Sequence, residues 1–448
     1  MAFKIKKRNY SYTRIIVLGF LLIIFLGAAL LALPISSRSG EVTNLLDCFF
    51  TSASATCVTG LMVYDTYTHW TLFGQIVILC LMQVGGLGFM TVVTLFSLML
   101  GRKISLTERH LMQEASNIMQ IGGIVRLTKH VLLGTLIIEG TGALFLSFKF
   151  VPILGLGEGI YNSIFHSISA FCNAGIDLMG KYRAFSSLTT LTHDLYIHTV
   201  LAVLVVIGGV GFVVWEDFYK NRNHWSKYSL HTKVVCVTTA GLIIVPAVMI
   251  FVSEYNASLV SMPLAEKIMM SFFHSISTRT AGFIAVDMST FHPSTVILTV
   301  LLMIIGGSPG STAGGIKTTT FFILLVSSYA AIRNKSNVGA FRRRFEDGAL
   351  RKASTVLFSF AAVSFAAIMV LSLIQALPID KVIYEVFSAI STSGMSLGIT
   401  PLLNPAAKVI VMVLMFFGRM GILSIALALS RTPAYAPVEY PKEKFVIG

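Results

Sequence analysis

Charged side chains are scarce in this sequence. Asp, Glu, Lys and Arg make up 12% of the 448 residues, while hydrophobic types make up 55% and the mean hydropathy is +0.80. A water-soluble globule carries far more charge, so the composition excludes that class. Runs of about 20 apolar residues, each long enough to cross a hydrocarbon core of about 30 Å, recur along the chain. We therefore predict an all-α integral membrane protein.

Paired cysteines and clusters of metal ligands are also missing. Five cysteines show no paired spacing and no neighbouring histidine set of the zinc-binding kind: Cys48, Cys57, Cys80, Cys172 and Cys236. We expect buried, reduced thiols. Lys and Arg outnumber Asp and Glu by 34 to 20, but they form no single patch with interleaved aromatic residues. This argues against a nucleic-acid partner.

Eight candidate transmembrane spans can be placed on the chain. They lie near residues 13–34, 71–100, 127–150, 194–219, 231–253, 294–331, 354–376 and 403–430. The first span follows no cleavable signal segment, so we expect it to be retained. Most Lys and Arg fall at the two termini or in the loops 101–130, 220–233 and 333–352. The positive-inside bias then places these loops and both termini in the cytoplasm.

Four polar segments that are too short to cross the membrane lie between an outward span and the next return span. They read FFTSASATCVTGL (49–61), FHSISAFCNAGI (165–176), FHSISTRTAGF (273–283) and FSAISTSGMSLG (387–398). A second glycine motif follows each of them: VGGLGF (84–89), IGGVGF (207–212), IGGSPG (305–310) and FGRMGI (417–422). A recurring pair of motifs indicates repeated units. We predict four pseudo-symmetric repeats of helix, re-entrant pore loop and helix around one central pore, with boundaries at 1–105, 106–225, 226–345 and 346–448.

The polar segments carry the residue types that a cation pore needs. Irregular backbone is tolerated at membrane depth only beside protein or a water-filled cavity, and glycine lets carbonyl groups turn toward an ion. The stretches 44–56, 159–171, 265–278 and 381–392 suit half-helices whose negative C-terminal ends face that ion. The predicted ion-binding residues are Cys57, Val58, Thr59, Gly60, Cys172, Asn173, Ala174, Gly175, Thr280, Ala281, Gly282, Thr392, Ser393 and Gly394. No carboxylate is among them, which argues against a divalent-cation filter, and Gly398 is an alternative to Gly394.

In these motifs the chain resembles the Trk/Ktr/HKT superfamily of potassium and other cation transporters, over residues 13–448. Within it the chain is similar to the bacterial Ktr membrane subunits, because it begins directly at the first repeat. The resemblance implies that Gly60, Gly175, Gly282 and Gly394 line a potassium-selective filter in the bacterial plasma (inner) membrane, whereas a serine in the first loop goes with sodium. It also implies a homodimer with one pore per subunit and a cytosolic nucleotide-binding ring of the KtrA type. Nucleotide is then expected only on that partner, with K⁺ as the transported ion and no cofactor in this chain.

The sixth span contains residues that defeat a regular helix, in the stretch GGSPGSTAGGIKTTT (306–320). We expect a break below the filter there, where the first and second repeats keep ordinary helix, and the resemblance implies an intramembrane gating loop. A kinked packing element is the alternative. The predicted gate residues are Gly306, Gly307, Ser308, Pro309, Gly310, Ser311, Thr312, Ala313, Gly314, Gly315, Ile316, Lys317 and Arg419.

Arg419 occupies the position that Gly86, Gly209 and Gly307 hold in the other repeats. An intramembrane arginine is costly and usually faces a cavity or a partner. We interpret it as a positive barrier below the filter. The alternative is a structural arginine tied to carbonyl groups or a carboxylate, and close helix packing is the alternative role for the glycines of this motif.

Other polar residues in apolar stretches have structural interpretations. Arg279 braces the third loop, and Glu139 pairs with a buried donor. His166 and His274 are the one tempting pair for an intramembrane enzyme, but their shared repeat position favours packing or hydrogen bonding, and we expect no enzymatic activity. An adaptor whose loops only organise partners remains a rival function. The basic segment 331–352 can bind an acidic protein surface or anionic lipid headgroups.

Overall fold

The computed structural model describes residues 12–88, 91, 110, 124–222, 224–334, 338–346, 348–421 and 425. These residues are mostly helical, and the strands among them are a two-stranded hairpin, β1 (Gly339–Ala340) and β2 (Arg343–Arg344). The predicted repeat boundary at 105, the inner ends of the spans 71–100 and 403–430, and both terminal segments lie outside the described residues.

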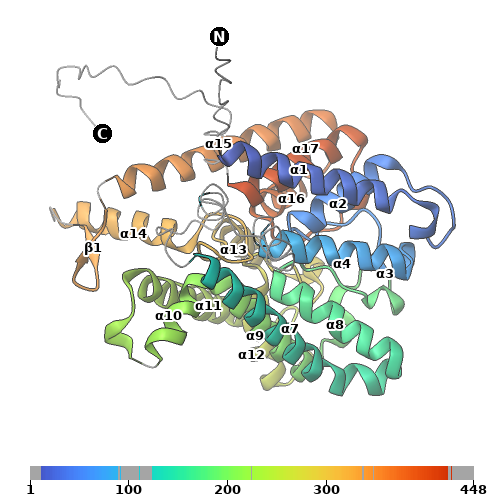
Figure 1. Ribbon diagram of the computed structural model, residues 1–448, viewed down its shortest axis with the longest axis horizontal. Helices are drawn as coiled ribbons and strands as arrows, with labels where there is room; N and C mark the ends of the chain where they lie inside the picture. The colour runs from blue at the N-terminus through green and yellow to red at the C-terminus, as the bar shows by residue number, and fades with distance from the viewer. Residues whose placement is uncertain are drawn as a thin grey trace, which may run out of the picture.

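Helices follow one another in an order that recurs four times (Figure 1). A long helix comes first: α1 (Tyr12–Leu31), α7 (Ile124–Leu154), α11 (Leu230–Glu254) and α15 (Ala349–Ile374). A shorter helix follows: α2 (Leu45–Thr56), α8 (Leu156–Cys172), α12 (Leu264–Ser277) and α16 (Ile379–Ser391). After a loop comes a third helix: α4 (Leu72–Leu87), α9 (Leu195–Val210), α13 (Pro293–Ile304) and α17 (Pro405–Met420). The other α-helices in the described part of the chain are α3 (Thr66–His69), α10 (Phe212–Asn221) and α14 (Thr318–Ile332).

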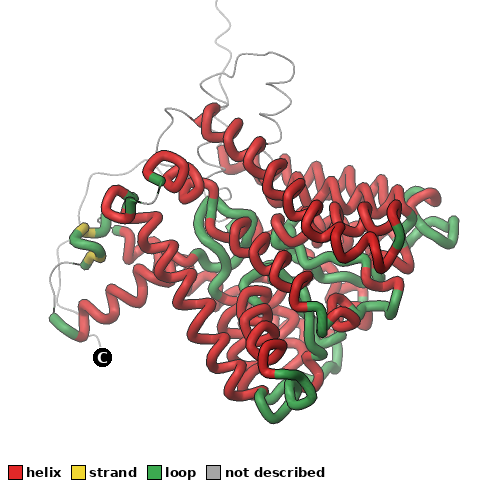
Figure 2. Tube along the Cα trace, turned by 90° about the horizontal axis from the view of Figure 1, so that it is seen from below, coloured by secondary structure: helices red, strands yellow, loops and turns green. Residues whose placement is uncertain are grey.

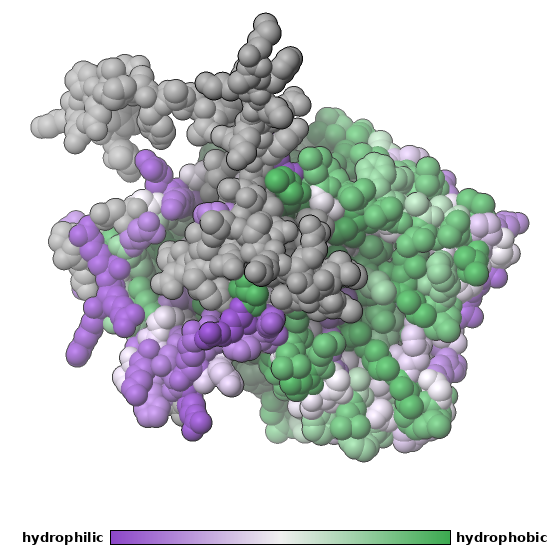
Figure 3. All heavy atoms as spheres, in the orientation of Figure 1, coloured by the Kyte–Doolittle hydropathy of each residue, from purple (hydrophilic) through white to green (hydrophobic). Residues whose placement is uncertain are grey.

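Several helices carry the apolar surface of membrane-spanning segments. Within the described residues, α1, α7, α11 and α15 are each long and apolar enough to cross a bilayer, and α9 with α10 forms a bent fifth candidate. Large apolar side chains on them are exposed, such as Phe358 at 77% and Leu373 at 82%. Figure 3 shows an apolar band on this face, with hydrophilic residues gathered at the ends, most densely around α10 and the hairpin. Such a band is expected where lipid, not water, surrounds the protein.

The four short helices pack in a closed circuit. Three of them contact the third helix of their own group and that of the group before: α2 contacts α4 and α17, α8 contacts α9 and α4, and α16 contacts α17 and α13. The fourth, α12, contacts α9 of the group before it. Loops run between the helices in the middle of the assembly (Figure 2). The chain therefore surrounds its own irregular segments with helix.

Local sequence sets where the short helices begin and how they are anchored. The Asn44 side chain accepts a hydrogen bond from the Leu46 backbone and caps α2, while Pro263 and Pro378 directly precede α12 and α16. A buried serine in each of three short helices donates to a carbonyl of the preceding long helix: Ser52 to Ile24 (2.8 Å), Ser167 to Glu139 (2.7 Å) and Ser275 to Ile243 (2.9 Å). These bonds fix the positions of α2, α8 and α12 along their long helices.

The predicted ordinary helix over 194–219 is wrong. The chain bends by 92° between α9 and α10, and Gly211 at the bend has φ +100°. In the first group α4 also ends early, with Gly88 at φ +84° as its C-cap. The bend at Gly211 lets the segment 305–317 approach, because Phe212 N donates to Gly310 O (2.9 Å) and a Cβ on Gly211 would lie 2.7 Å from Pro309 O. Glycine is needed there for both φ and space.

The expectation of buried thiols holds for some cysteines only. All five are free, and Cys48, Cys57 and Cys172 are buried. Cys80, however, is exposed and Cys236 is half-buried. Cys80 lies on α4 next to outward-facing apolar residues. Because a free cysteine behaves as a small hydrophobic side chain, Cys80 suits this apolar outer surface as well as it would suit the core.

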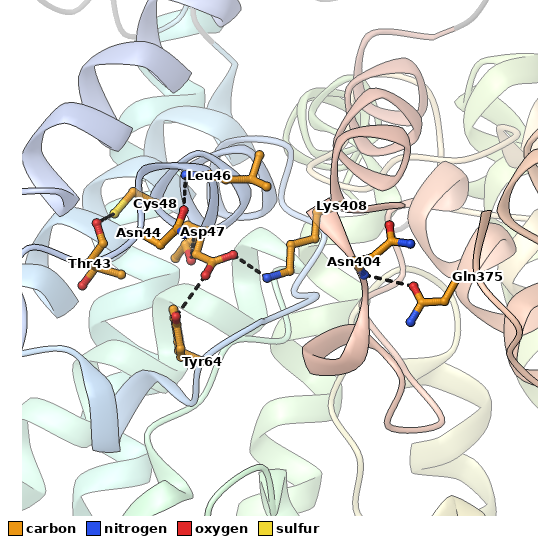
Figure 4. A network of polar contacts seen from close by, with 10 residues as sticks. Thr43, Asn44, Leu46, Asp47, Cys48, Tyr64, Gln375, Asn404 and Lys408 are labelled. Atoms are coloured by element: carbon orange, nitrogen blue, oxygen red, sulfur yellow. Dashed lines mark hydrogen bonds and ion pairs between the residues drawn. The ribbon is translucent and has the colours of Figure 1, made fainter. Parts of the chain in front are cut away.

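A buried ion pair joins the last helix to the first short helix (Figure 4). Lys408 Nζ of α17 lies 2.6 Å from Asp47 Oδ1 of α2, and the Tyr64 hydroxyl donates to Asp47 Oδ2 (2.9 Å). The two charged side chains are 12% and 7% exposed. Beside this pair, Asn404 N donates to Gln375 Oε1 (2.9 Å), which ties α17 to the end of α15. These contacts close the circuit between the two ends of the chain.

We expect Lys408→Met to destabilise the protein markedly. Removing one partner of a buried ion pair leaves the other charge uncompensated, at a cost of about 3–5 kcal/mol. Thermal unfolding of the purified protein in detergent measures this effect. Lys181→Met is the matched control, because Lys181 and Glu158 form an exposed pair (2.6 Å), which water screens so that it contributes little to stability. Equal melting of the two variants would show that the Lys408 pair does not hold the circuit closed.

Candidate functional site

The loops after the four short helices share one backbone pattern. In each, the residue two positions before the glycine adopts a left-handed conformation: Val58 (φ 55°), Asn173 (φ 59°), Thr280 (φ 69°) and Thr392 (φ 55°). The glycine itself also has a positive φ: Gly60 (90°), Gly175 (66°), Gly282 (81°) and Gly394 (85°). Two positive φ values with one residue between them turn carbonyl groups away from the directions that they have in a helix, and non-glycine residues adopt such values at an energetic cost. The same turn is therefore built four times.

The four glycines form a closed ring. A Cβ added to any of them would lie less than 3.0 Å from the carbonyl oxygen of the residue that precedes the next glycine. The pairs are Gly60 with Ala174, Gly175 with Ala281, Gly282 with Ser393, and Gly394 with Thr59. Each loop thus touches the next, and the fourth touches the first. No side chain larger than hydrogen fits at these four positions without moving backbone.

The structure shows which of the two glycines of the fourth loop belongs to the ring. Gly394 and Gly398 have nearly the same φ, 85° and 84°. A Cβ on Gly394 would collide with Thr59 O, whereas a Cβ on Gly398 would meet nothing within 4 Å. Gly394 is therefore the ring member, and Gly398 lies outside the ring.

Hydroxyl groups lie at the ring and just behind it. The hydroxyl oxygens of Thr59, Thr280 and Thr392 are buried and have no hydrogen-bond partner among the described residues, while Ser393 Oγ donates to Thr278 O (3.0 Å). Cys57 and Cys172 are completely buried, and the Asn173 amide lies against Gly208 and Gly209 of α9. The predicted site residues thus come together, but the side chains of Cys57, Cys172 and Asn173 face the surrounding helices.

The glycines of the second motif pack against the ends of the short helices. A Cβ on Gly85, Gly208 or Gly418 would collide with the carbonyl oxygen of Thr56, Phe171 or Ile390, respectively. This agrees with the close-packing interpretation of the motif. The third helices can therefore support the loops from directly behind.

One side of the ring opens into a cavity of about 220 Å³. All four ring glycines line it, together with residues of the outer loops such as Met62, Phe185 and Thr400. Asp177, two positions beyond Gly175, is the charged residue among the described residues that line this cavity. Burial raises the pKa of the Asp177 carboxyl to about 7, and nearby Asp65 adds to the effect. The sequence analysis did not select Asp177, although its place directly after a filter glycine was a usable signal.

The segment 305–317 lies on the opposite side of the ring. It separates α13 from α14, so the predicted break of this span is confirmed. Thr312 Oγ1 donates to Phe171 O (3.1 Å), and Ser308 N donates to Gly209 O (3.0 Å). A Cβ on Gly314 would collide with the Thr392 hydroxyl. The segment is therefore packed beneath the second and fourth loops.

Arg419 fastens this segment to α4. Its guanidinium donates to the carbonyl oxygens of Thr312, Gly85 and Gly86, the last at 3.0 Å. Lys317 Nζ donates to Ala313 O (2.6 Å) within the segment. Two cationic side chains thus lie below the ring, and carbonyl groups bind both.

The other polar residues that the sequence singled out have different surroundings. Gln83 Nε2 donates to Glu139 Oε2 (3.0 Å), which confirms the predicted buried donor. His166 Nδ1 is hydrogen-bonded to Asn162 O (2.8 Å) and His274 Nε2 to Thr299 Oγ1 (2.9 Å), as the hydrogen-bonding interpretation requires. The Arg279 side chain is 7% exposed, and its Nε has no hydrogen-bond partner in the described part of the chain. The predicted bracing role of Arg279 stays a prediction.

The glycine loops form a ring inside a set of apolar helices. A cavity leads to the ring on one side, and an irregular segment covers it on the other. This is the architecture of an ion-translocating membrane protein. Residues 13–436 match the family described as "Cation transport protein", TrkH, and the chain belongs to this family. The family comprises transporters and not enzymes.

Relatives match along nearly their whole length. The chain is 38% identical to the potassium/sodium uptake protein NtpJ of Enterococcus hirae over 99% of this chain and 98% of that one. It is 39% identical to the Ktr system potassium uptake protein B of Bacillus subtilis, over 99% and 98% of the two chains. Among solved structures, the potassium transporter TrkH from Vibrio parahaemolyticus has the same fold, with a TM-score of 0.74 at 17% identity, over 96% of this chain and 87% of that one.

Proposed function

We propose that this chain takes up potassium across the bacterial plasma membrane by conducting the ion through the ring of four glycines. The observation that carries the proposal is the closure of that ring, in which each loop touches the next. Backbone carbonyls that replace the hydration shell of an ion favour K⁺ over a smaller, more strongly hydrated cation. The names of the relatives, a potassium/sodium uptake protein and a potassium uptake protein, both include this ion and support it.

The ion path runs from the cavity of about 220 Å³, through the ring, to the segment 305–317. The short helices end at the loops, so their C-terminal dipoles stabilise a cation there without a carboxylate in the ring. The carbonyl oxygens of Thr59, Ala174, Ala281 and Ser393 and the free threonine hydroxyls are the proposed ligands. K⁺ is the cargo of this site.

We assign the chain eight transmembrane spans in four pseudo-symmetric repeats. The spans are α1, α4, α7, α9 with α10, α11, α13 with α14, α15 and α17, and the units 1–105, 106–225, 226–345 and 346–448 together make one pore domain. The recurring order of long, short and third helices supports this assignment. With the basic loops in the cytoplasm, both termini are cytoplasmic.

The segment 305–317 acts as the gate in this proposal, and Arg419 as a positive barrier beside it. In the packed arrangement the segment fills the inner side of the ring and is fastened to α4 through Arg419. Conduction then requires the segment to move, because the segment and the Arg419 guanidinium together block the path of a potassium ion.

A cytosolic nucleotide-binding ring of the KtrA type controls the gate, and two copies of the chain form a homodimer. The name of one relative, a component of a Ktr "system", supports the existence of a partner component. The hydrophilic end around α10 and the hairpin, which carries Arg342, Arg343 and Lys220, offers a basic surface for an acidic protein face or anionic lipids (Figure 3). Nucleotide binds only to the partner in this scheme.

Sodium is the second candidate ion, because the Enterococcus hirae relative is named for both potassium and sodium. Flux of potassium and of sodium into liposomes that contain the purified full-length chain distinguishes the two candidate ions. We expect wild-type flux to be potassium-selective and Gly60→Ser to lower the potassium-to-sodium ratio by about tenfold, corresponding to about 1.4 kcal/mol. The reason is that a side chain at Gly60 displaces the carbonyl of Ala174 from the ring.

Gly40→Ser is the matched control. Gly40 also has a positive φ, 72°, but a Cβ there meets nothing within 4 Å. Its selectivity should equal that of the wild type. Flux that is indifferent to Gly60→Ser would refute the ring as the selectivity filter, and no cation flux at all would favour an adaptor function.

A further inference from the structure

The outer cavity carries a single charge at its wall. Of the described residues that line it, Asp177 alone is charged, and the others are glycines, apolar side chains and hydroxyl residues. The cavity adjoins the ring directly, since Gly175 lines it as well. A cation that approaches the ring through this cavity therefore passes one carboxylate.

Asp177 is held in a fixed position. Its Oδ1 accepts from Met179 N (2.8 Å), and its neighbour Leu178 donates from its backbone to His166 Nε2 (3.5 Å). Asp65 supports the same segment, because its Oδ2 accepts from Phe185 N (2.9 Å) and a Cβ on Gly180 would collide with it. Asp177 is 6% exposed and lines the cavity, so it forms part of a rigid wall.

The basic residues of this segment are engaged elsewhere. Lys181 Nζ lies 2.6 Å from Glu158 Oε2. Arg183 lines an adjoining outer cavity of about 780 Å³, together with Asp287, Asp380 and Lys381. Phe185, Ile284, Ser396 and Gly398 line both cavities, but these four charged residues line only the adjoining one. Asp177 thus has no cationic partner on the wall of the cavity that leads to the ring, in the part of the chain that the structure describes.

We propose that Asp177 sets the apparent affinity for potassium by binding the hydrated ion in the outer cavity before it enters the ring. A fixed charge at the wall of a narrow cavity raises the local concentration of counter-ions, because field lines are focused by the low-dielectric walls. The carboxylate accepts hydrogen bonds from the ion's water shell, and the ring carbonyls then replace that shell. This inference rests on the proposed function and adds a residue to it.

The test is potassium uptake into liposomes that contain the full-length chain, measured as a function of the external potassium concentration. The pH is about 8.5, where the Asp177 carboxylate is ionised. For Asp177→Asn we expect KM to rise about tenfold at low ionic strength with the maximal rate unchanged, and the difference to shrink in high salt. Asparagine keeps the oxygen that accepts from Met179, so folding is preserved. Asp177→Glu should restore most of the affinity.

Asp380→Asn is the matched control, since Asp380 is an exposed outer acid that lines the adjoining cavity and not the cavity at the ring. Its KM should equal that of the wild type. An unchanged KM in Asp177→Asn, or a lower maximal rate with the same KM, would overturn the inference while leaving the ring intact. Failure of the proposed function looks different, because the wild-type chain would then show no potassium-selective flux for Asp177 to modulate.

Discussion

Gly394→Ala is expected to abolish potassium uptake while the protein still folds. A Cβ at this position collides with the carbonyl oxygen of Thr59, a backbone atom that belongs to the first loop. The contact cannot be relieved by rotating a side chain, so one of the two loops must move away from the ring. A displaced carbonyl no longer replaces the water of a dehydrating ion, and transport depends on that replacement.

Gly398→Ala isolates the cause of the effect. The two glycines have φ values of 85° and 84°, so alanine suffers the same backbone strain, about 1–3 kcal/mol, at either position. At Gly398, however, the added methyl group meets nothing within 4 Å. Uptake into liposomes, normalised to the amount of folded protein, should be lost only in Gly394→Ala. Equal losses would mean that strain and not closure of the ring matters, and retained uptake in Gly394→Ala would place the filter elsewhere.

Arg419→Ala is expected to raise potassium flux strongly. The guanidinium opposes a passing cation and fastens Thr312 of the gate segment to Gly86 of α4. For an ion that passes about 8 Å from the charge at an effective dielectric constant of about 20, the repulsion is about 2 kcal/mol. Its removal corresponds to about a thirtyfold higher rate. The flux of the purified protein without any partner is the measurement.

A conservative variant separates charge from tethering at this position. Arg419→Lys keeps the positive charge but loses the planar fork that reaches several carbonyl groups at once. If the charge is the barrier, Arg419→Lys stays close to wild-type flux, and if the tether is the barrier, it resembles Arg419→Ala. Unchanged flux in Arg419→Ala at an unchanged folded level would exclude both roles and leave a purely structural arginine.

Local patterns in the sequence were sufficient to predict the elements of the site. Glycine at four similar places, preceded by stretches with serine and apolar residues, predicted the short helices within a few residues of their ends, for example 44–56 for α2 (Leu45–Thr56). The run of Gly, Pro and Ser after Ile304 predicted the break between α13 and α14. Backbone chemistry decides these features, and it acts over a few residues.

Features that depend on contacts between distant segments were not predictable. Gly211 belongs to a motif that also suits straight, close-packed helices, and only the approach of Pro309 shows why the chain bends there. Gly394 and Gly398 are equivalent by sequence and by φ, and they differ only through Thr59, which is more than 300 residues away. The position of Asp177 at the cavity wall likewise depends on how the loops of separate groups meet.

Because one chain supplies all four sides of the glycine ring, the sides need not be chemically equal. In a channel built from four identical subunits, an inward arginine would be present in four copies, and their mutual repulsion would exclude both the ion and the subunits themselves. Here Arg419 is a single copy, and the segment 305–317 likewise occurs once. Because the four sides belong to one polypeptide, each can be mutated independently of the others. The four filter glycines can therefore stay alike while the residues of a single side change to close the ion path.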